Sequence, residues 1–519
     1  MKVSLNWLKD YIDLPQELSA HDLAYQLTMC TVEVEAVEDL AAQFEKMVVG
    51  KIVSIEQHPN ADKLKIVNTD TGAGAPVGIV CGGSNLTEGM FVAIAQTGAK
   101  VQWHGEGDLI ELKPATIRGV KSEGMICAAN EIGLAHLFPM NDEKEIVDLT
   151  ALSQENALTP GMGLAKALRL DDIILEIDNK SLTNRPDLWG HYGIARELAA
   201  IYNLELRPSI TPVELPKGDS KVLSVSISEP TRSNRYMGVA FECEKGLQSP
   251  YWMKTRLALM GQRSINLLVD LTNYVLFSLG QPMHVFDRGK LHGTAITVRN
   301  AKEGERIKLL DEQEYELTKH DLVIADEKTP VALAGVMGGL ESSVTDSTTH
   351  VLLESANFEP TGIRKAGSRY GLRSESSMRF EKGIDSTRAK EGIFLYLSLL
   401  KDLAPKISLT ASEDCFPVAP QAVTVCVSRD FINSRIGREL SSKEIQEKLE
   451  RLSFGVSESK GEFTLSVPSW RATGDVSIPE DIVEEVARMY GYDNIEFVAP
   501  KIILERAIFQ PPYDALRQV

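Results

Sequence analysis

Short runs rich in β-branched residues follow one another between residues 44 and 130 of this 519-residue chain. They cover residues 48–55, 64–68, 77–80 and 91–95, and Gly, Pro and Asn separate them. Short strands at such a spacing, with turn residues between them, are typical of a small barrel. A barrel of this size uses only a small part of the chain, so we predict further folded units on either side of it.

The rest of the sequence divides into stretches of different character. Residues 171–203 contain a predicted strand and a predicted helix, and a proline-rich linker follows. Residues 220–400 mix strand-like and helix-like segments, and a smaller mixed module with a helix at 442–452 occupies residues 405–475. A chain of this length is too long to fold around a single hydrophobic core. We therefore predict a multidomain α+β protein.

Charge and cysteine content narrow the class of function. The formal net charge is −18, which argues against indiscriminate nucleic-acid binding, since phosphate contacts need a basic surface. An RNA contact confined to one module, or shared with a partner chain, stays open. The six cysteines are scattered without a Cys-x-x-Cys pair, which favours reduced thiols in the cytoplasm over a zinc site or a disulfide framework. We expect neither a signal peptide nor a membrane span.

Acidic residues gather in and before a helix predicted at about 479–490. At about 100° per residue, Asp481, Glu484 and Glu485 share one face of this helix and the apolar residues share another. Asp475 precedes the helix, within reach of the same end. Such acids commonly complement the helix dipole and stay solvated. A hard divalent cation with oxygen ligands would also relieve their repulsion.

Three separated motifs in the barrel segment resemble a known module. They are VGKIV at 49–53, HPNADKL at 58–64 and GVKSEGM at 119–125. Together they are similar to the oligonucleotide-binding (OB) barrel appended to several tRNA synthetases, which implies contact with RNA. Residues 45–127 hold eight Lys or Arg and nine Asp or Glu. This weak charge signal leaves open the alternative of a structural docking barrel.

Further motifs resemble the β subunit of bacterial-type phenylalanyl-tRNA synthetases. The similarity runs in order from Trp7 to Ile495. Its motifs are TNRPD at 183–187, NLLVDLTNYV at 266–275, LGQPMHVFD at 279–287, AGVMGG at 334–339, LLESA at 352–356 and RFEKG at 379–383. The combination is specific because these motifs are distributed over almost the whole chain.

The resemblance implies a domain order. Residues 1–38 and 153–205 would form an N-terminal α/β domain into which an OB-type, tRNA-binding barrel at 39–152 is inserted. A B3/B4-type editing block at 215–400 and a winged-helix-like B5-type module at 401–478 would follow. Residues 479–519, with a helix beginning near Tyr513, would start a catalytic-like domain. Since the family continues beyond this point, the resemblance implies a truncated chain.

In this family the central block removes tyrosine wrongly attached to tRNA(Phe). The resemblance assigns that editing pocket to Asn273, His284, Gly335, Glu354, Ser374 and Ser376. An apolar synthetic pocket rejects an added hydroxyl poorly, so a second site that hydrogen-bonds the hydroxyl is useful. We expect Glu354 to accept from the tyrosine phenol, and Asn273 and His284 to orient the ester or a water. Taken without the family, His284 reads as an ordinary loop residue and Glu354 as a backbone cap.

Two positions depart from the family pattern. The family commonly has threonine where Ser374 stands and alanine where Ser376 stands. Ser374 keeps a hydroxyl, whereas Ser376 adds one to the expected pocket.

The resemblance also assigns Asp475, Asp481, Glu484 and Glu485 to a magnesium site shared with an α subunit. It implies an α2β2 ligase that joins phenylalanine to tRNA(Phe), with ATP and Mg²⁺ used at the α subunit and no aminoacylation residue in this chain. We expect the α subunit and tRNA(Phe) as partners, and neither DNA nor a membrane. Two alternatives remain, a free-standing tRNA-binding protein and a stand-alone trans-editing hydrolase.

Overall fold

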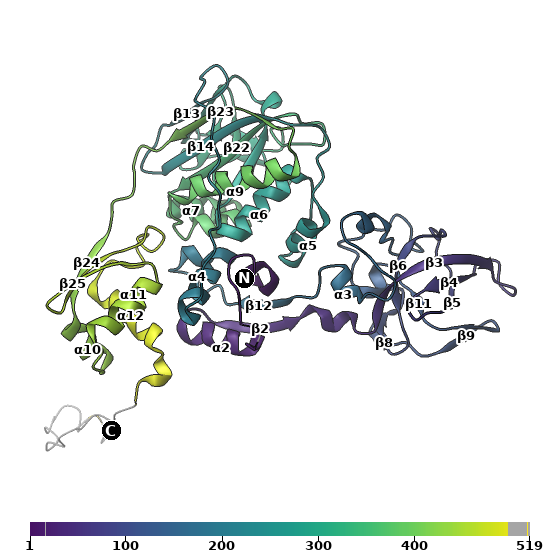
Figure 1. Ribbon diagram of the computed structural model, residues 1–519. Coiled ribbons are helices and arrows are strands. Elements are labelled where there is room, and N and C mark those ends of the chain that lie inside the picture. Colours follow the sequence, from purple (N-terminus) through teal and green to yellow (C-terminus); the bar gives the residue numbers. More distant parts are fainter. Residues whose placement is uncertain (16, 497–515, 517–519) are drawn as a thin grey trace.

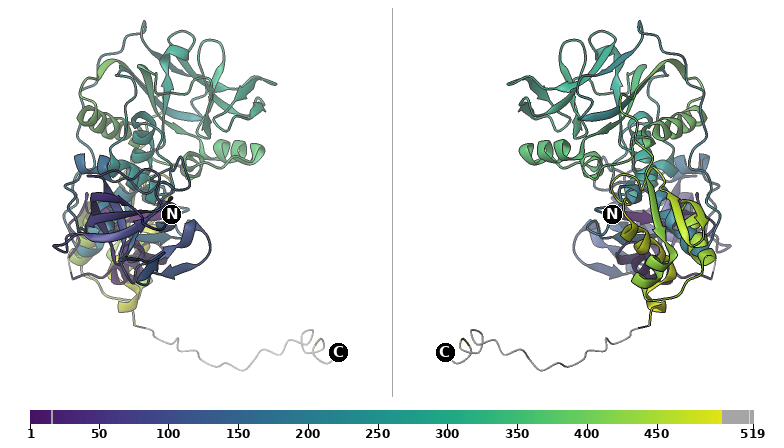
Figure 2. Two further views of the ribbon diagram at one scale, coloured as in Figure 1. Left: turned by 90° about the vertical axis from the view of Figure 1, so that its right-hand side faces the viewer. Right: turned by 90° about the vertical axis from the view of Figure 1, so that its left-hand side faces the viewer.

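The computed structural model describes residues 1–15, 17–496 and 516. A small N-terminal unit lies at the centre, with the barrel on one side, a small module on the other and the large block above (Figure 1). Figure 2 views the molecule from either side and brings the barrel and the small module to the front in turn. Within the described part of the chain, no helix has the length and apolar character needed to cross a membrane. The helix expected near Tyr513 begins outside the described residues.

The N-terminal unit is built from two segments that are distant in sequence. Its antiparallel sheet has the order β1 (Lys2–Ser4), β12 (Ile173–Ile177), β2 (Val34–Asp39). Its helices are α1 (Leu5–Leu8), α2 (Ala20–Cys30) and α4 (His191–Tyr202). Because β12 pairs with both early strands, the barrel is an insertion into this unit, as the sequence predicts.

The barrel is a sheet of five strands that almost closes on itself. Its order is β11 (Met125–Ile126), β6 (Phe91–Ala95), β3 (Met47–Gln57), β4 (Lys65–Asp70), β5 (Val77–Cys81). Inward-facing residues from its strands, such as Ile52, Val67 and Ile79, fill its interior. The pairs β7 (Lys100–Gln102) with β8 (Leu109–Glu111), and β9 (Ala115–Ile117) with β10 (Val120–Ser122), extend from it. A second core beneath the barrel includes α3 (Leu164–Ala167). The predicted barrel is confirmed.

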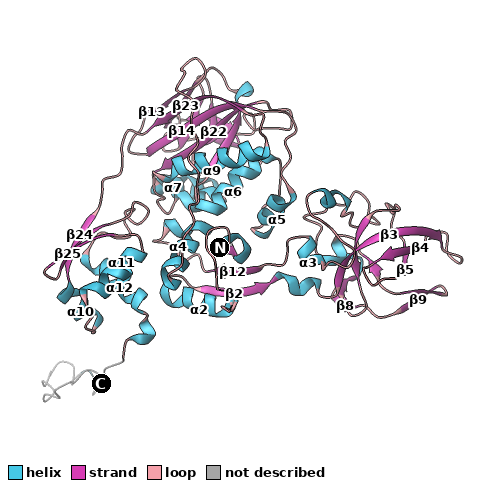
Figure 3. Ribbon diagram, in the orientation of Figure 1, coloured by secondary structure: helices cyan, strands magenta, loops and turns pink. Residues whose placement is uncertain are grey.

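The large block has two sheets (Figure 3). One has the order β15 (Met283–Asp287), β22 (His350–Phe358), β14 (Ser233–Glu242), β23 (Ser408–Cys415). The other has the order β13 (Ser224–Ile227), β16 (Ala295–Asn300), β19 (Leu322–Ala325), β20 (Pro330–Leu333), β21 (Met337–Gly338). The hairpin β17 (Arg306–Lys308) and β18 (Glu314–Glu316) accompanies the second sheet.

Each face of the first sheet belongs to a different core. Helices α6 (Leu267–Leu279) and α9 (Arg388–Leu403) pack on one face, through residues such as Leu353 and Tyr396. The opposite face packs on the second sheet, through residues such as Leu352 and Phe286. Helices α5 (Tyr251–Leu259), α7 (Pro360–Tyr370) and α8 (Glu375–Phe380) complete the block. The expected end at 400 was too early, because β23 pairs with β14.

The small module combines a three-stranded sheet with three helices. The strand order is β24 (Thr424–Ser428), β26 (Glu462–Ser466), β25 (Gly455–Ser459). The helices are α10 (Arg429–Ile436), α11 (Ser442–Arg451), whose predicted capping box is present, and α12 (Pro479–Tyr490). Ile482 and Val486 of α12 share a core with Val425 and Phe463. The expected boundary at 478 therefore divides this core, and α12 belongs to the module.

The N-terminal unit and the large block meet in a close backbone contact. A Cβ at Gly190, just before α4, would lie 2.5 Å from the backbone nitrogen of Gly280. Beside it, the buried ring of His191 stacks on Trp7 with centroids 4.2 Å apart. Its Nδ1–H donates to the Phe277 carbonyl (2.8 Å), and its Nε2 accepts from the Ser4 N–H (3.0 Å). Burial lowers the pKa of His191 to about 3, so the ring is neutral.

We expect Gly190→Ala to lower the free energy of unfolding by about 1–3 kcal/mol, because the new methyl group meets backbone that has no room to move. Urea unfolding followed by circular dichroism measures the loss. Gly163→Ala is the matched control, since a Cβ there meets no atom within 4 Å. Equal losses in the two variants would contradict a close contact at Gly190.

Candidate functional site

A cavity of about 490 Å³ opens between the two sheets of the large block and helix α6. Its walls come from α6, β15, β19, β20, β22, the loop between β20 and β21, and the start of α8. The structure brings all six residues expected from the sequence to this one cavity: Asn273, His284, Gly335, Glu354, Ser374 and Ser376. They come from segments up to about a hundred residues apart: strand pairing joins His284 to Glu354, and the packing of α6, α8 and the β20–β21 loop brings the others to them.

Glu354 is the buried acid of the cavity. It lies on the interior strand β22 and is only 6% exposed. The hydroxyl of Tyr236, on β14, donates to Glu354 Oε2 at 3.0 Å. Burial raises the pKa of Glu354 to about 8, and the hydrogen bond from Tyr236 opposes this rise. A carboxyl group in this state can accept or donate a hydrogen bond near neutral pH.

His284 lies directly opposite Glu354 on the neighbouring strand β15. Burial lowers its pKa to about 4, so the imidazole is neutral near pH 7. Its Nε2 atom is shielded from solvent and has no hydrogen-bond partner among the described residues. The ring packs on Gly338, where an added Cβ would lie 2.4 Å from His284 Cε1. Glycine at 338 therefore makes room for this histidine beside the cavity.

The two serines hold the loop that forms the opposite rim. Ser374 caps α8 and donates to the Val336 carbonyl at 2.7 Å, and Ser376 donates to the Gly335 carbonyl at 3.3 Å. Gly335 has φ +68°, and a Cβ there would lie 2.8 Å from Ile363. The hydroxyl that Ser376 adds to the family pattern is thus used to fix the loop.

The arrangement combines a neutral imidazole, a buried carboxyl group and the side chain of Asn273 around one cavity. Such a set can hydrogen-bond a polar ligand and a water, while apolar residues such as Leu276 and Phe380 contact its hydrocarbon part. Sequence reasoning missed Tyr236. No strand was predicted at this position, and only the structure shows that its buried hydroxyl lies on β14 beside Glu354.

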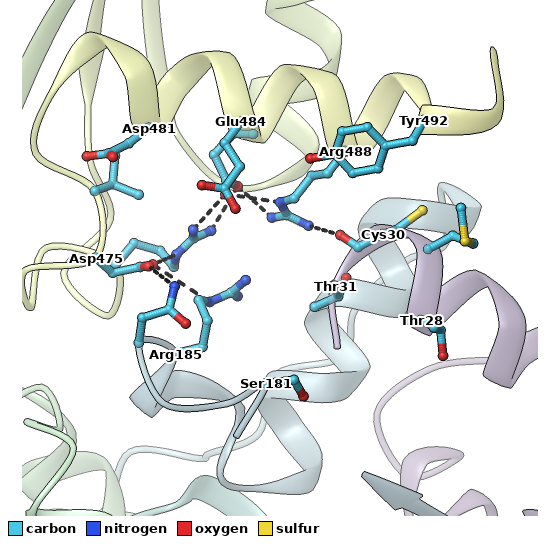
Figure 4. A pocket seen from close by; sticks show the side chains of 15 residues that line it. Thr28, Cys30, Thr31, Ser181, Arg185, Asp475, Asp481, Glu484, Arg488 and Tyr492 are labelled. Atoms are coloured by element: carbon cyan, nitrogen blue, oxygen red, sulfur yellow. Dashed lines mark hydrogen bonds and ion pairs between the residues drawn. The ribbon is translucent and has the colours of Figure 1, made fainter. Parts of the chain in front are cut away.

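The acidic residues near α12 form a different arrangement (Figure 4). Asp475 accepts from Arg471 and, at 3.1 Å, from Asn184, and it lies 3.7 Å from Arg185 Nε. Glu485 accepts from Arg471 at 2.7 and 2.9 Å and from Arg488 at 2.5 and 3.0 Å.

The other two acids are placed differently. Asp481 accepts from the N–H groups of Ser477 and Ile478 at the start of its own helix, and Glu484 is exposed. In the part of the chain that the structure describes, no three His, Cys, Asp or Glu side chains gather in a way that suits a metal ion. All four expected magnesium ligands nevertheless line one cavity of about 220 Å³, so their assignment to a shared metal site stays a prediction. Arginines already neutralise Asp475 and Glu485, the two acids that point inward.

These arginines belong to a buried network that joins the small module to the N-terminal unit. Glu197 of α4 accepts from Arg185 at 2.6 Å and from Arg488 of α12 at 2.6 Å. Burial opposes the charge of Glu197, but Arg488 and Arg185 hold its pKa well below the usual value. Burial likewise opposes the charge of Glu485, while Arg488 and Arg471 bring its pKa to about 2. The network thus favours the ionised forms of Glu197 and Glu485, whereas at Asp475 burial outweighs the arginines and raises the pKa.

We expect Glu197→Gln to lower the free energy of unfolding by about 3–5 kcal/mol, because two buried arginines lose an anionic partner. Chemical unfolding, with limited proteolysis to detect release of residues 424–490, measures the effect. Glu484→Gln, on the exposed side of α12, is the control and is expected to change stability little.

The same network predicts acid lability. The ordinary pKa of a glutamate is 4.5, and in the folded protein the pKa values of both Glu197 and Glu485 lie below it. Their stabilisation is therefore complete above pH 4.5 and is lost as the pH falls from about 4.5 towards 2. Unchanged stability of Glu197→Gln at pH 7 would contradict this account.

We expect millimolar Mg²⁺ to leave the unfolding midpoint of this chain alone unchanged, since Arg471 already pairs with both Asp475 and Glu485. Thermal unfolding in MgCl2 and in NaCl of equal ionic strength provides the comparison. A specific rise with Mg²⁺ that disappears in Asp475→Asn would restore these acids as a metal site.

Three family models match successive parts of the chain. They are described as "Putative tRNA binding domain" (residues 47–153), "B3/4 domain" (233–405) and "tRNA synthetase B5 domain" (425–492). The B3/4 match contains the cavity residues, and the B5 match contains α12 and its acidic residues.

Curated relatives are similar over nearly the whole chain. The phenylalanine–tRNA ligase β subunit of Staphylococcus epidermidis is 38% identical over 96% of this chain and 61% of its own length. The Bacillus cereus β subunit is 39% identical over 98% of this chain and 61% of its own length. The chain thus spans about three fifths of these relatives.

One solved structure, an N-terminal fragment of the phenylalanyl-tRNA synthetase β subunit from Pyrococcus horikoshii, has a TM-score of 0.35 at 18% identity. It covers 62% of this chain and 88% of that one, a similarity too low to argue from. The three family models follow one another along this chain, two of them described by tRNA binding or tRNA synthetases, and the curated relatives match nearly all of it. The chain belongs to the family of phenylalanine–tRNA ligase β subunits.

Proposed function

We propose that this chain acts as part of a phenylalanine–tRNA ligase β subunit and hydrolyses tyrosine from mischarged tRNA(Phe). The observation that carries the proposal is the convergence of the six expected residues on one cavity of suitable size for an amino-acid side chain. Their assignment as an editing pocket comes from the family, and the buried, hydrogen-bonding acid supports it.

The cavity suits a tyrosyl ester. The phenol of the ligand is expected to reach Glu354, and the apolar wall to contact its ring. Water then adds to the ester carbonyl, and the bond from that carbon to the ribose oxygen breaks. Free tyrosine and the uncharged tRNA 3′ end are the products. The neutral His284 and the amide of Asn273 are the groups we propose to orient the ester and the water.

The remaining roles follow from the family. The barrel is proposed to contact tRNA(Phe), and the chain to assemble with an α subunit as an α2β2 ligase in the cytoplasm. ATP and its Mg²⁺ are proposed to act at the α subunit, where phenylalanine is activated. No catalytic residue for aminoacylation is proposed in this chain.

A second candidate is trans-editing by the chain alone. The described residues that line the cavity lie between 262 and 380, so this chain by itself supplies all six expected residues. On this reading the chain deacylates Tyr-tRNA(Phe) in solution without assembly. Adding purified α subunit to the assay distinguishes the two: a rate that depends on α favours the assembled ligase.

We expect Glu354→Ala and His284→Ala each to slow deacylation of Tyr-tRNA(Phe) by about 100-fold, because each removes a polar partner from a desolvated site. Release of labelled tyrosine is the measurement, with Phe-tRNA(Phe) as the reference substrate. The control is Glu341→Ala, which changes an exposed acid of the same block. Full activity in both cavity variants would reject the pocket.

A further inference from the structure

We infer that Tyr236 is a positioning residue for Glu354: its hydroxyl holds one carboxyl oxygen and leaves the other to recognise a phenolic ligand. This inference rests on the proposed function and deepens it by naming what sets the preference for tyrosine. Tyr236 lies outside the set of residues that line the cavity, so its effect is exerted through Glu354.

The register of the sheet explains why these two side chains meet. Glu354 pairs with Gly238 of β14, and Tyr236 pairs with Ala356 of β22. Tyr236 is thus the diagonal neighbour of Glu354 on the same face, at a distance that a long aromatic side chain spans. Gly238, directly opposite, has no side chain to compete for the carboxyl group.

Hydrogen bonding at Glu354 is one-sided. Tyr236 donates to Oε2, and among the described residues it is the one group that hydrogen-bonds this carboxyl. His284, the opposite cross-strand neighbour, makes no such bond, and its Nε2 stays without a partner. Oε1 is therefore left for a ligand. With Tyr236 itself 0% exposed, the carboxyl has little freedom to turn away.

Ionisation gives this arrangement a measurable signature. A ligand phenol donates more strongly to a carboxylate than to a neutral carboxyl group. Burial raises the pKa of Glu354 to about 8, so the preference for tyrosine over phenylalanine is expected to increase as the pH rises through this value. Tyr236 favours the ionised form, and removing its hydroxyl moves the midpoint to higher pH.

Other titratable groups face Glu354 or line the same cavity. Tyr236 faces it from β14 and His284 from β15, while Arg373 and Glu375 line the cavity from the start of α8. His284 titrates at about 4, far below the window of interest.

The test compares binding of L-tyrosinamide and L-phenylalaninamide by calorimetry between pH 6.5 and 9. The two ligands share the same amine, so its titration cancels in the affinity ratio. We expect the wild-type ratio to favour tyrosinamide increasingly with pH. In Tyr236→Phe the ratio at pH 7.5 is expected to fall about tenfold and the midpoint to rise, with phenylalaninamide affinity unchanged. Glu354→Gln is expected to abolish the pH dependence.

If Tyr236→Phe does not fold, 3-fluorotyrosine at position 236 is a second variant, and it retains the packing of the tyrosine ring. Its more acidic phenol is a stronger donor, so the midpoint is expected to move to lower pH. A wild-type chain without preference for tyrosinamide would reject the proposed pocket. If the wild-type chain prefers tyrosinamide but neither change at position 236 alters the size or the pH midpoint of this preference, only the role of Tyr236 is rejected.

Discussion

Glu197 lies near the middle of helix α4, is 3% exposed, and accepts hydrogen bonds from Arg185 of its own unit and Arg488 of the last helix. A buried carboxylate is costly unless it is paired and hydrogen-bonded. Because the two cations come from segments three hundred residues apart, satisfying Glu197 requires the small module to lie against the N-terminal unit. Arg488 then also pairs with Glu485, and Arg471 joins Glu485 to Asp475. This network thus fixes the acidic helix against the N-terminal unit, together with the core that α12 shares with Ala200 of α4.

The large block uses a buried carboxyl group in the opposite way. In the network, cations surround each inward-facing carboxylate, which holds the pKa of Glu485 at about 2. At Glu354 a single neutral donor is present, and burial raises the pKa to about 8. In the first arrangement both oxygens of Asp475 and of Glu485 already accept hydrogen bonds, whereas in the second Glu354 Oε1 accepts none from the described residues and lies beside a cavity. This difference in partners separates a structural cluster from a candidate site.

Local patterns were enough to predict many elements. Each of the four runs predicted in the barrel corresponds to one strand, because alternating β-branched residues specify a half-buried strand. Helix α12 begins at Pro479, which has no N–H group that would need a partner at a helix start. Helix α11 follows Ser441, whose capping box accepts from a free N–H group there. The ends of the large block and of the module were misplaced. They depend on β23 pairing with β14 and on α12 entering a core, both of which are contacts between distant residues.

The sequence by itself determined the family, the order of the domains and the six residues that meet at the cavity. It also placed Asp481, Glu484 and Glu485 on one face of a helix, which the 3.6-residue period is sufficient to predict. Only the tertiary structure decided what that face contacts. Arg185 arrives from the N-terminal unit and Arg471 from the preceding loop, and they pair with Asp475 and Glu485 beside a cavity that the four acids share. Tyr236 likewise became a partner of Glu354 through strand register alone, because hydrogen bonds between distant side chains leave no periodic signal in the chain.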